Sequence, residues 1–196
     1  MLQIIISKNA KYSLSESAQM AIEGGAQWLL LKVDAQRADK MRGEIVDIVA
    51  MCKDKGIILT IENCIEQARE YGLHGVFISD NNISPLKVRE ELGAEAIIGS
   101  VVATPDSATS LYRGDIDYVA FSDIDNAKEF INDVRLCGCE IPIVAYVAGS
   151  KLSDTDLDTF KQSGFSGICS GEQIFSDSTD PVEKIAHIIK HLSPQT

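Results

Sequence analysis

Residues able to bind hard metal ions and phosphate groups follow short apolar runs throughout this sequence. Carboxylates come directly after several of these runs, at Asp34, Glu62, Asp80 and Asp123. Carboxylate oxygens suit Mg²⁺, which takes few protein carboxylates and keeps much of its water shell. Lys32 has the charge to meet a phosphate group or to pair with Glu62. These residue types predict a site for a phosphorylated small molecule that would take Mg²⁺ as cofactor. The same residues also suit a solvated rim of salt bridges, and that alternative stays open.

Two glycine-containing segments offer backbone amides to an anion. Gly149-Ser150-Lys151 and Ser170-Gly171 follow the last two apolar runs. Backbone amides at such turns, next to the start of a helix, bind phosphate in many α/β barrels. The alternative is that these glycines only serve tight connections.

The apolar runs have the length and the β-branched composition of strands. Most are apolar at consecutive residues, which is typical of strands covered on both faces in a parallel sheet. The predicted strands are 2–7, 27–33, 56–61, 75–79, 96–102, 117–122, 141–147 and 167–170. The segments between them are amphipathic, so strands and helices alternate along the whole chain.

Helix boundaries are also readable. Ser13 and Glu16 have the spacing of a capping box. Ser84-Pro85, Thr104-Pro105 and Asp180-Pro181 place a capping residue before a proline at the first helical position. Left-handed C-caps are expected at the glycines that precede strands, namely Gly24-Gly25, Gly56, Gly72, Gly93, Gly114, Gly138 and Gly164. A helix over 38–54 has an apolar stripe of Met41, Ile45, Ile48, Val49 and Cys52.

This alternation predicts a closed (β/α)8 barrel, the TIM barrel, as a single domain over residues 1–196. The loops must be short, because such barrels rarely have fewer than about 200 residues. An open doubly wound sheet is the alternative, although no glycine-rich dinucleotide fingerprint follows the first strand. In a barrel the carboxyl ends of all strands meet at one face. That face would gather the residues above with Asn63, Asn82, Ser100, Thr104 and Glu172.

Composition excludes several classes of partner. The formal net charge is −11, which argues against binding nucleic acid or an anionic membrane surface. No apolar segment is long enough to span a bilayer. We therefore expect a cytoplasmic protein, monomeric or homodimeric, whose partner is a small phosphorylated molecule.

Cysteine and histidine give weaker signals. The five cysteines form no disulfide framework and favour a reducing compartment. Cys137-Gly138-Cys139 is interpreted as a pair of ordinary thiols at a helix end, because zinc and redox motifs use wider spacings. His187 and His191 have i, i+4 spacing, but no third ligand is evident nearby in the sequence, so we interpret their segment as a surface helix.

Four segments together resemble one known family. They are GLHGVFISDNNISPLKVREELGAEAIIGSVVATPDSA, GDIDYVAFSD, IPIVAYVAG and GFSGICSGEQIF. In order and spacing they are similar to the thiamine phosphate synthase and thiazole tautomerase family over nearly the whole chain. The resemblance implies a (β/α)8 barrel. It also implies an enzyme of thiamine biosynthesis that joins a pyrimidine methyl diphosphate to a thiazole phosphate, with Mg²⁺ holding the pyrophosphate that leaves.

Matching the family's functional positions implies a metal set of Glu62, Asn63, Asp80 and Asn82, which replace other oxygen ligands. At the end of strand two, Lys32 keeps a positive charge of the family's Gln-x-Arg-x-Lys run, whereas Asp34 reverses one. The serine of strand five falls at Val101, next to Ser100, and the tautomerase histidine falls at Ala103.

Two further positions differ from the family. Its Thr-x-Thr-Lys loop, which grips pyrophosphate, has no counterpart after Ser122, and its paired glycines fall near Val147-Ala148, with Gly149 following. Cationic support for a leaving pyrophosphate contributes several kcal/mol to such a reaction. Two hypotheses therefore remain, a thiamine phosphate synthase-like transferase and a non-catalytic barrel that binds a phosphorylated small molecule or a partner protein.

Overall fold

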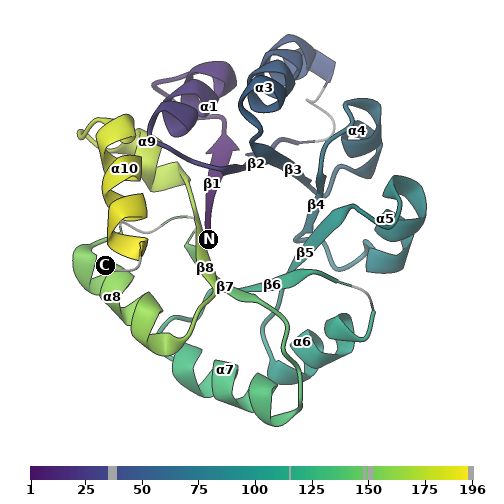
Figure 1. Cartoon of the computed structure of the whole chain (residues 1–196). Helices are drawn as coiled ribbons and strands as arrows, with labels where there is room; N and C mark the ends of the chain where they lie inside the picture. Colours follow the sequence, from purple (N-terminus) through teal and green to yellow (C-terminus); the bar gives the residue numbers. More distant parts are fainter. Residues whose placement is uncertain (35–38, 115, 148, 150–151, 194–196) are drawn as a thin grey trace.

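The chain forms a closed barrel of parallel strands surrounded by helices (Figure 1). The computed structural model describes residues 1–34, 39–114, 116–147, 149 and 152–193. The strands follow one another around the barrel in sequence order, and β1 pairs with β8 to close it. They are β1 Leu2–Ser7, β2 Trp28–Lys32, β3 Ile58–Glu62, β4 Gly75–Ile78, β5 Ile97–Val101, β6 Tyr118–Phe121, β7 Ile143–Val147 and β8 Gly167–Ser170. The (β/α)8 prediction is confirmed.

Helices cover the outside of this ring (Figure 1). They are α1 Leu14–Glu23, η1 Asp39–Met41, α3 Arg42–Lys55, α4 Ile65–Glu70, α5 Pro85–Leu92, α6 Pro105–Tyr112, α7 Ala127–Leu136, α8 Asp154–Ser163, α9 Glu172–Ser176 and α10 Pro181–Leu192. The short helices η1 and α9 were not expected from the sequence. The helix predicted over 38–54 begins as α3 at Arg42, after the turn of η1, and it buries Ile45, Ile48 and Cys52 as expected.

Most helix caps form where the sequence predicts them. Ser13 and Glu16 make the capping box of α1, and Thr104 and Asp180 cap α6 and α10 through their side chains. Ser84 takes the N-cap position of α5 but makes no side-chain cap bond. Positive φ angles occur at Gly25, Gly56, Gly72, Gly93, Gly138 and Gly164, but Gly114 does not adopt one.

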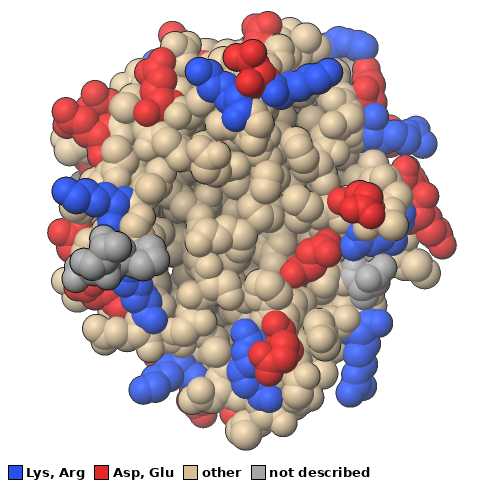
Figure 2. Space-filling model, in the orientation of Figure 1, with Lys and Arg blue, Asp and Glu red and all other residues tan. Residues whose placement is uncertain are grey.

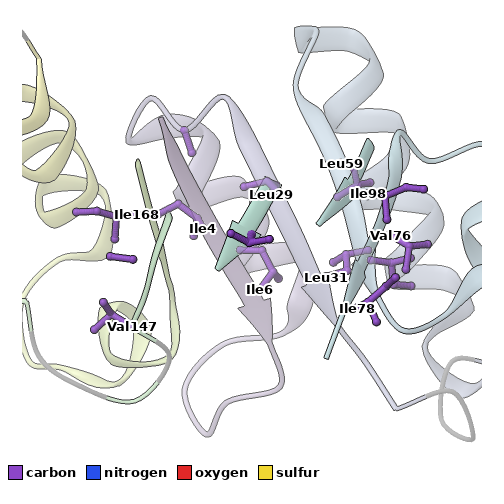
Figure 3. Packing of buried hydrophobic residues seen from close by; sticks show 14 of the residues in the cluster. Ile4, Ile6, Leu29, Leu31, Leu59, Val76, Ile78, Ile98, Val147 and Ile168 are labelled. Atoms are coloured by element: carbon purple, nitrogen blue, oxygen red, sulfur yellow. The ribbon is translucent and has the colours of Figure 1, made fainter. Parts of the chain in front are cut away.

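The side chains of each strand alternate between two apolar layers. Ile4, Leu29, Val76 and Ile98 lie on the outer side, within a cluster that also includes buried residues of the helices (Figure 3). Ile5, Leu30, Phe77 and Cys169 lie on the inner side and fill the barrel interior. Both faces are buried, which explains why the strands are apolar at consecutive residues. It also means that every second residue at a strand's carboxyl end points into the barrel mouth.

The acidic side chains of the described residues are spread over the face shown and form no single negative patch there. Charged side chains of both signs lie around the edge of the barrel, and mostly uncharged residues cover the middle of this face (Figure 2). Among the residues that the structure describes, no helix is both long and apolar enough to cross a membrane.

Candidate active site

Three side chains of the inner layer mark the mouth of the barrel. Lys32 and Glu62 are the last residues of β2 and β3, and Tyr146 is the penultimate residue of β7. Lys32 continues the inner series of Trp28 and Leu30, and Tyr146 packs directly against the inner cluster. Carboxyl ends of barrel strands are where such folds place their active sites. These residues therefore define the centre of the candidate site.

The cation at this mouth has an anionic partner. The Lys32 ammonium lies 3.4 Å from a carboxylate oxygen of Glu172, at the start of α9. Both side chains are partly exposed, at 38% and 43%, so water screens the pair. Lys32 therefore carries a charge that an anionic ligand could take over from Glu172. The alternative pairing of Lys32 with Glu62 is not what the structure shows.

Glu62 is the most enclosed carboxylate at the mouth, with 8% of its surface exposed. None of the residues that the structure describes donates a hydrogen bond to it. Burial, and then the Glu62 charge, raise the pKa of the Tyr146 hydroxyl and of the Cys169 thiol, which places all three in one electrostatic environment. A carboxylate without a protein donor has oxygens available for a metal ion or a ligand.

Aromatic rings form the floor below these charges. The rings of Phe77 and Tyr146 stack with centroids 5.6 Å apart and an interplanar angle of 16°. The ring of Tyr118 stacks against Phe77 with centroids 6.1 Å apart and meets Trp28 edge-on at 5.5 Å. Below the rings, the Trp28 Nε1–H donates to Thr60 Oγ1 at 3.0 Å and the Tyr118 hydroxyl donates to Gln3 Oε1 at 3.3 Å, whereas the buried Gln3 Nε2 has no partner among the described residues. Of these rings only Tyr146 is partly exposed, so it is the one that can meet a flat aromatic ligand.

The loops after β3 and β4 are held together by Asn63. The Asn63 side-chain oxygen accepts hydrogen bonds from the backbone amides of Ser79 and Asp80, at 2.8 and 3.1 Å, and its Nδ2 donates to Ser79 Oγ at 2.8 Å. Its φ of 58° lies in the left-handed region, which asparagine tolerates better than most residues. In turn, Asp80 Oδ1 accepts from the backbone and side chain of Asn82, at 2.9 and 2.8 Å.

This network brings together Asn63, Asp80 and Asn82, which are three of the four predicted metal ligands. Several of their oxygens, however, already accept hydrogen bonds. Asn63 Oδ1 and Asp80 Oδ1 each already accept two hydrogen bonds, which leaves Asp80 Oδ2, Asn82 Oδ1 and the Glu62 carboxylate as the available oxygens. Two carboxylates fit what Mg²⁺ takes from proteins when phosphate oxygens and water complete its shell.

Several predicted substrate residues lie away from the interior. Ser100 and Ser170 share the outer side of their strands with Ile98 and Ile168, and they are 7% and 1% exposed. Ser100 Oγ donates to the Val101 carbonyl at 3.3 Å. The Thr104 hydroxyl accepts the Ser107 amide at the start of α6. The hydroxyls of Ser100 and Thr104 therefore have local partners, and Ser100 and Ser170 lie on the outer side of their strands.

The two predicted glycine segments differ in packing. A Cβ at Gly171 would lie 2.1 Å from the Ile5 carbonyl oxygen, so this glycine is required by the contact between β8 and β1. A Cβ at Gly149 would meet nothing within 4 Å. Ser150, Lys151 and Ala148 lie outside the described residues. Asp34 is exposed just after β2.

Pockets flank the mouth on the side of β1. One of about 330 Å³ is lined by Ser7, Lys8, Asn9 and residues of α9, including Glu172. A second, of about 610 Å³, lies between the start of α1 and η1 and also includes Lys8 and Asn9. Lys8 thus gives this side of the mouth a second cation.

Sequence reasoning missed the aromatic floor. Phe77, Tyr118 and Tyr146 stand in apolar runs, where we interpreted every residue as core. Their alternation with outer residues such as Val76 and Ile78 was the signal that could have identified them, because residues two apart on a barrel strand share a face.

Comparison with known sequences gives a consistent result. The profile of a family described as thiamine monophosphate synthase matches residues 2–170. A thiamine-phosphate synthase of Phocaeicola vulgatus is 26% identical over 203 residues, which cover 96% of this chain and 96% of that protein. A thiamine-phosphate synthase of Bacteroides thetaiotaomicron is 23% identical, with 96% of this chain and 95% of that protein covered.

Solved structures share the fold. A thiamine phosphate pyrophosphorylase from Pyrococcus furiosus superimposes with a TM-score of 0.81 at 16% identity, covering 97% of this chain and 94% of that one. An orotidine 5'-phosphate decarboxylase from Pyrococcus horikoshii has a TM-score of 0.70 at 13% identity, covering 98% and 99%. At these identities the likeness establishes the architecture and leaves the chemistry to the site.

Proposed function

Because the chain belongs to the thiamine monophosphate synthase family, we propose that it joins a pyrimidine methyl diphosphate to a thiazole phosphate at the carboxyl-terminal mouth of its barrel. The observation that carries this proposal is the pairing of an aromatic floor with charges directly above it. The partly exposed ring of Tyr146, backed by the buried ring of Phe77, offers a surface for a planar heterocycle, and Lys32 and Glu62 end the strands β2 and β3.

The reaction places opposite demands on the two parts of the site. The bond between the pyrimidine methylene carbon and the diphosphate oxygen must break, so positive charge develops on the pyrimidine and negative charge on the leaving group. The face of the Tyr146 ring would favour the positive charge. Lys32 and Lys8 supply positive charge to the leaving diphosphate or to the thiazole phosphate.

The available oxygens support a role for Mg²⁺. Glu62 and the free oxygen of Asp80 would hold the ion, and Asn63 would keep the Asp80 loop in place. Bound there, Mg²⁺ would neutralise charge on the diphosphate. The Asn82 side chain donates through Nδ2 to Asp80, which leaves its Oδ1 as a further oxygen for the ion.

A turnover assay tests this proposal. Purified protein is incubated with both substrates and Mg²⁺, and thiamine phosphate is measured by liquid chromatography and mass spectrometry. Product should form above a no-enzyme background and fall at least tenfold in Lys32→Ala and Tyr146→Leu. Lys55→Ala and Tyr112→Leu change the same residue types at exposed positions on α3 and α6 and serve as matched controls. No product from the unmodified protein would contradict the transferase.

A second candidate is a barrel that binds a phosphorylated small molecule without turnover. Two observations favour it. Glu172 already neutralises Lys32, and β6 passes to α7 through only residues 122–126, where Asp123 accepts hydrogen bonds from Asn126. In that case each substrate alone would raise the melting temperature, yet both substrates together with Mg²⁺ would form no product.

A further inference from the structure

The outer helical layer contains a second cluster of potential ligands, distinct from the barrel mouth. His187 and His191 lie one turn apart on α10, and Asp154 is the first residue of α8. The ligand atoms of these three side chains all lie within 4.8 Å of one another. We propose that Asp154, His187 and His191 bind a divalent transition-metal ion, of which Zn²⁺ is the prime candidate.

The cluster depends on how the two helices pack. α8 and α10 are neighbours on the outside of the barrel (Figure 1). They run in the same direction, because Asp154 faces His187 and, one turn further along both helices, Asp158 faces His191. An i, i+4 pair of acids therefore lies opposite an i, i+4 pair of histidines. The third ligand that the sequence around His187 lacks comes from a different helix.

The distances between these side chains are close to those of a metal site. His187 Nε2 lies 2.7 Å from Asp154 Oδ1, and His191 Nε2 lies 2.8 Å from Asp158 Oδ1. Ligand atoms around a tetrahedral Zn²⁺ with bonds of about 2.0–2.1 Å are roughly 3.3 Å apart. A movement of about half an ångström would open the contact between His187 and Asp154 to that spacing, and ligand-atom pairs of the cluster that lie farther apart, within 4.8 Å, would close toward it. The exposed side chains of His187 and Asp154, at 55% and 66%, have room for it.

The donor set selects the class of ion. Two imidazole nitrogens and one or two carboxylate oxygens suit Zn²⁺ and its neighbours Co²⁺, Ni²⁺ and Cu²⁺. Mg²⁺ and Ca²⁺ prefer oxygen ligands alone. Asp158 stands at the edge of the cluster and can complete a fourth position, which water fills otherwise. This set differs in kind from the all-oxygen set at the mouth.

A bound ion would link α10 to α8, next to the place where β1 pairs with β8 and closes the barrel. α10 packs against α1 and α8, beside the seam where β1 pairs with β8. Its apolar side is anchored by Ile185 and Ile188, which are 0% and 2% exposed. A metal bridge on its polar side would add a second link to α8. The expected role is therefore stabilisation of the folded barrel, since an ion that binds only the folded state shifts unfolding.

A metal titration tests the proposal on the whole chain, stripped beforehand with a chelator. Zn²⁺ should bind with one ion per chain by calorimetry and raise the melting temperature, and His187→Ala should lose this rise while keeping any effect of equal Mg²⁺. Co²⁺ in place of Zn²⁺ should give a visible d–d absorption band that reports nitrogen and oxygen ligation. His187→Ala, His191→Ala and Asp154→Ala should each weaken Zn²⁺ binding at least tenfold.

Matched controls separate this site from adventitious binding. His74→Ala removes the remaining histidine, which accepts the Leu59 amide before β4, and Cys137→Ser removes the exposed thiol. Both should keep the Zn²⁺ affinity and the Co²⁺ spectrum. Equal Zn²⁺ binding by His187→Ala and the unmodified chain, or no Zn²⁺-dependent change in melting temperature, would overturn the proposal. Circular dichroism of each variant confirms that its fold is retained.

Discussion

The ammonium of Lys32 lies 3.4 Å from the carboxylate of Glu172, so a single ion pair links the end of β2 to the start of α9 across the barrel mouth. Glu172 thereby competes with any anionic ligand for this cation. Ion pairs that are exposed to this extent contribute roughly 0.2–1 kcal/mol to the stability of the fold. The relationship makes Glu172 a residue whose removal should improve phosphate binding.

Glu172→Gln should therefore raise the affinity for thiazole phosphate by up to about fivefold, the equivalent of about 1 kcal/mol. Calorimetric titration measures it, and the free energy of unfolding should change by less than about 1 kcal/mol. Lys32→Met should have the opposite effect on affinity. Weaker binding by Glu172→Gln would mean that Glu172 itself contacts the ligand.

Gly171→Ala tests the close contact between β8 and β1. The added Cβ would lie 2.1 Å from the Ile5 carbonyl oxygen and 2.5 Å from its Cβ, so the barrel must shift at its seam. Overpacking of this kind costs about 1–3 kcal/mol or more. Gly43→Ala, on α3 with nothing within 4 Å of its new Cβ, should instead stabilise by up to about 1 kcal/mol. Urea unfolding compares them, and equal stabilities would refute the packing argument.

The sequence predicts the barrel well because its fold depends on a repeated local pattern. Consecutive apolar residues indicate strands buried on both faces, and caps such as Ser13 with Glu16 locate helix starts. The face to which each strand residue points is harder to predict. Ser100 and Ser170 lie near the carboxyl ends of β5 and β8 but share a side with Ile98 and Ile168, so they pack outward.

Contacts between different helices and loops cannot be predicted from a single sequence, for a different reason. The Asp154 carboxylate meets His187 because two helices far apart in the chain pack in parallel, and no spacing within either helix records this. Likewise, Asn63 appears as a strand-end amide, whereas the structure uses it to hold the backbone of Ser79 and Asp80. The residue types in the sequence predict candidate site residues, whereas the packing of the elements determines which of these residues already have hydrogen-bond partners.

Asn63→Ala should loosen the loop that carries Asp80. It removes three hydrogen bonds, which at partial exposure are together worth about 1–2 kcal/mol. It also places alanine at a φ of 58°, which alanine tolerates less well. Urea unfolding measures the loss, and any Mg²⁺-dependent binding should weaken with it. Asn81→Ala, at an exposed position in the same loop, is the control, and an equal loss there would argue against a special role for Asn63.

The capping box of α1 should make a small part of the stability depend on pH. The Ser13 backbone amide and hydroxyl donate to Glu16 and lower the pKa of its carboxyl below the ordinary 4.5. Because the folded pKa is depressed, this stabilisation is present above the ordinary pKa and is lost as the pH falls through the folded one. The stability difference between the unmodified chain and Glu16→Ala should therefore shrink between neutral pH and pH values below the folded pKa. A difference that grows on acidification would contradict this sign.

The five cysteines should react at very different rates, because only Cys137 is exposed. Burial raises the pKa of the Cys52 and Cys64 thiols to about 11, and it also raises that of Cys169, so these stay protonated at pH 8. The thiolate is the reactive form, and access limits it further. Brief iodoacetamide treatment of the native chain should add one carbamidomethyl group by mass spectrometry, at Cys137, and Cys137→Ser should remove it. Fast modification of Cys139, which is buried two residues further along, would show that the end of α7 opens in solution.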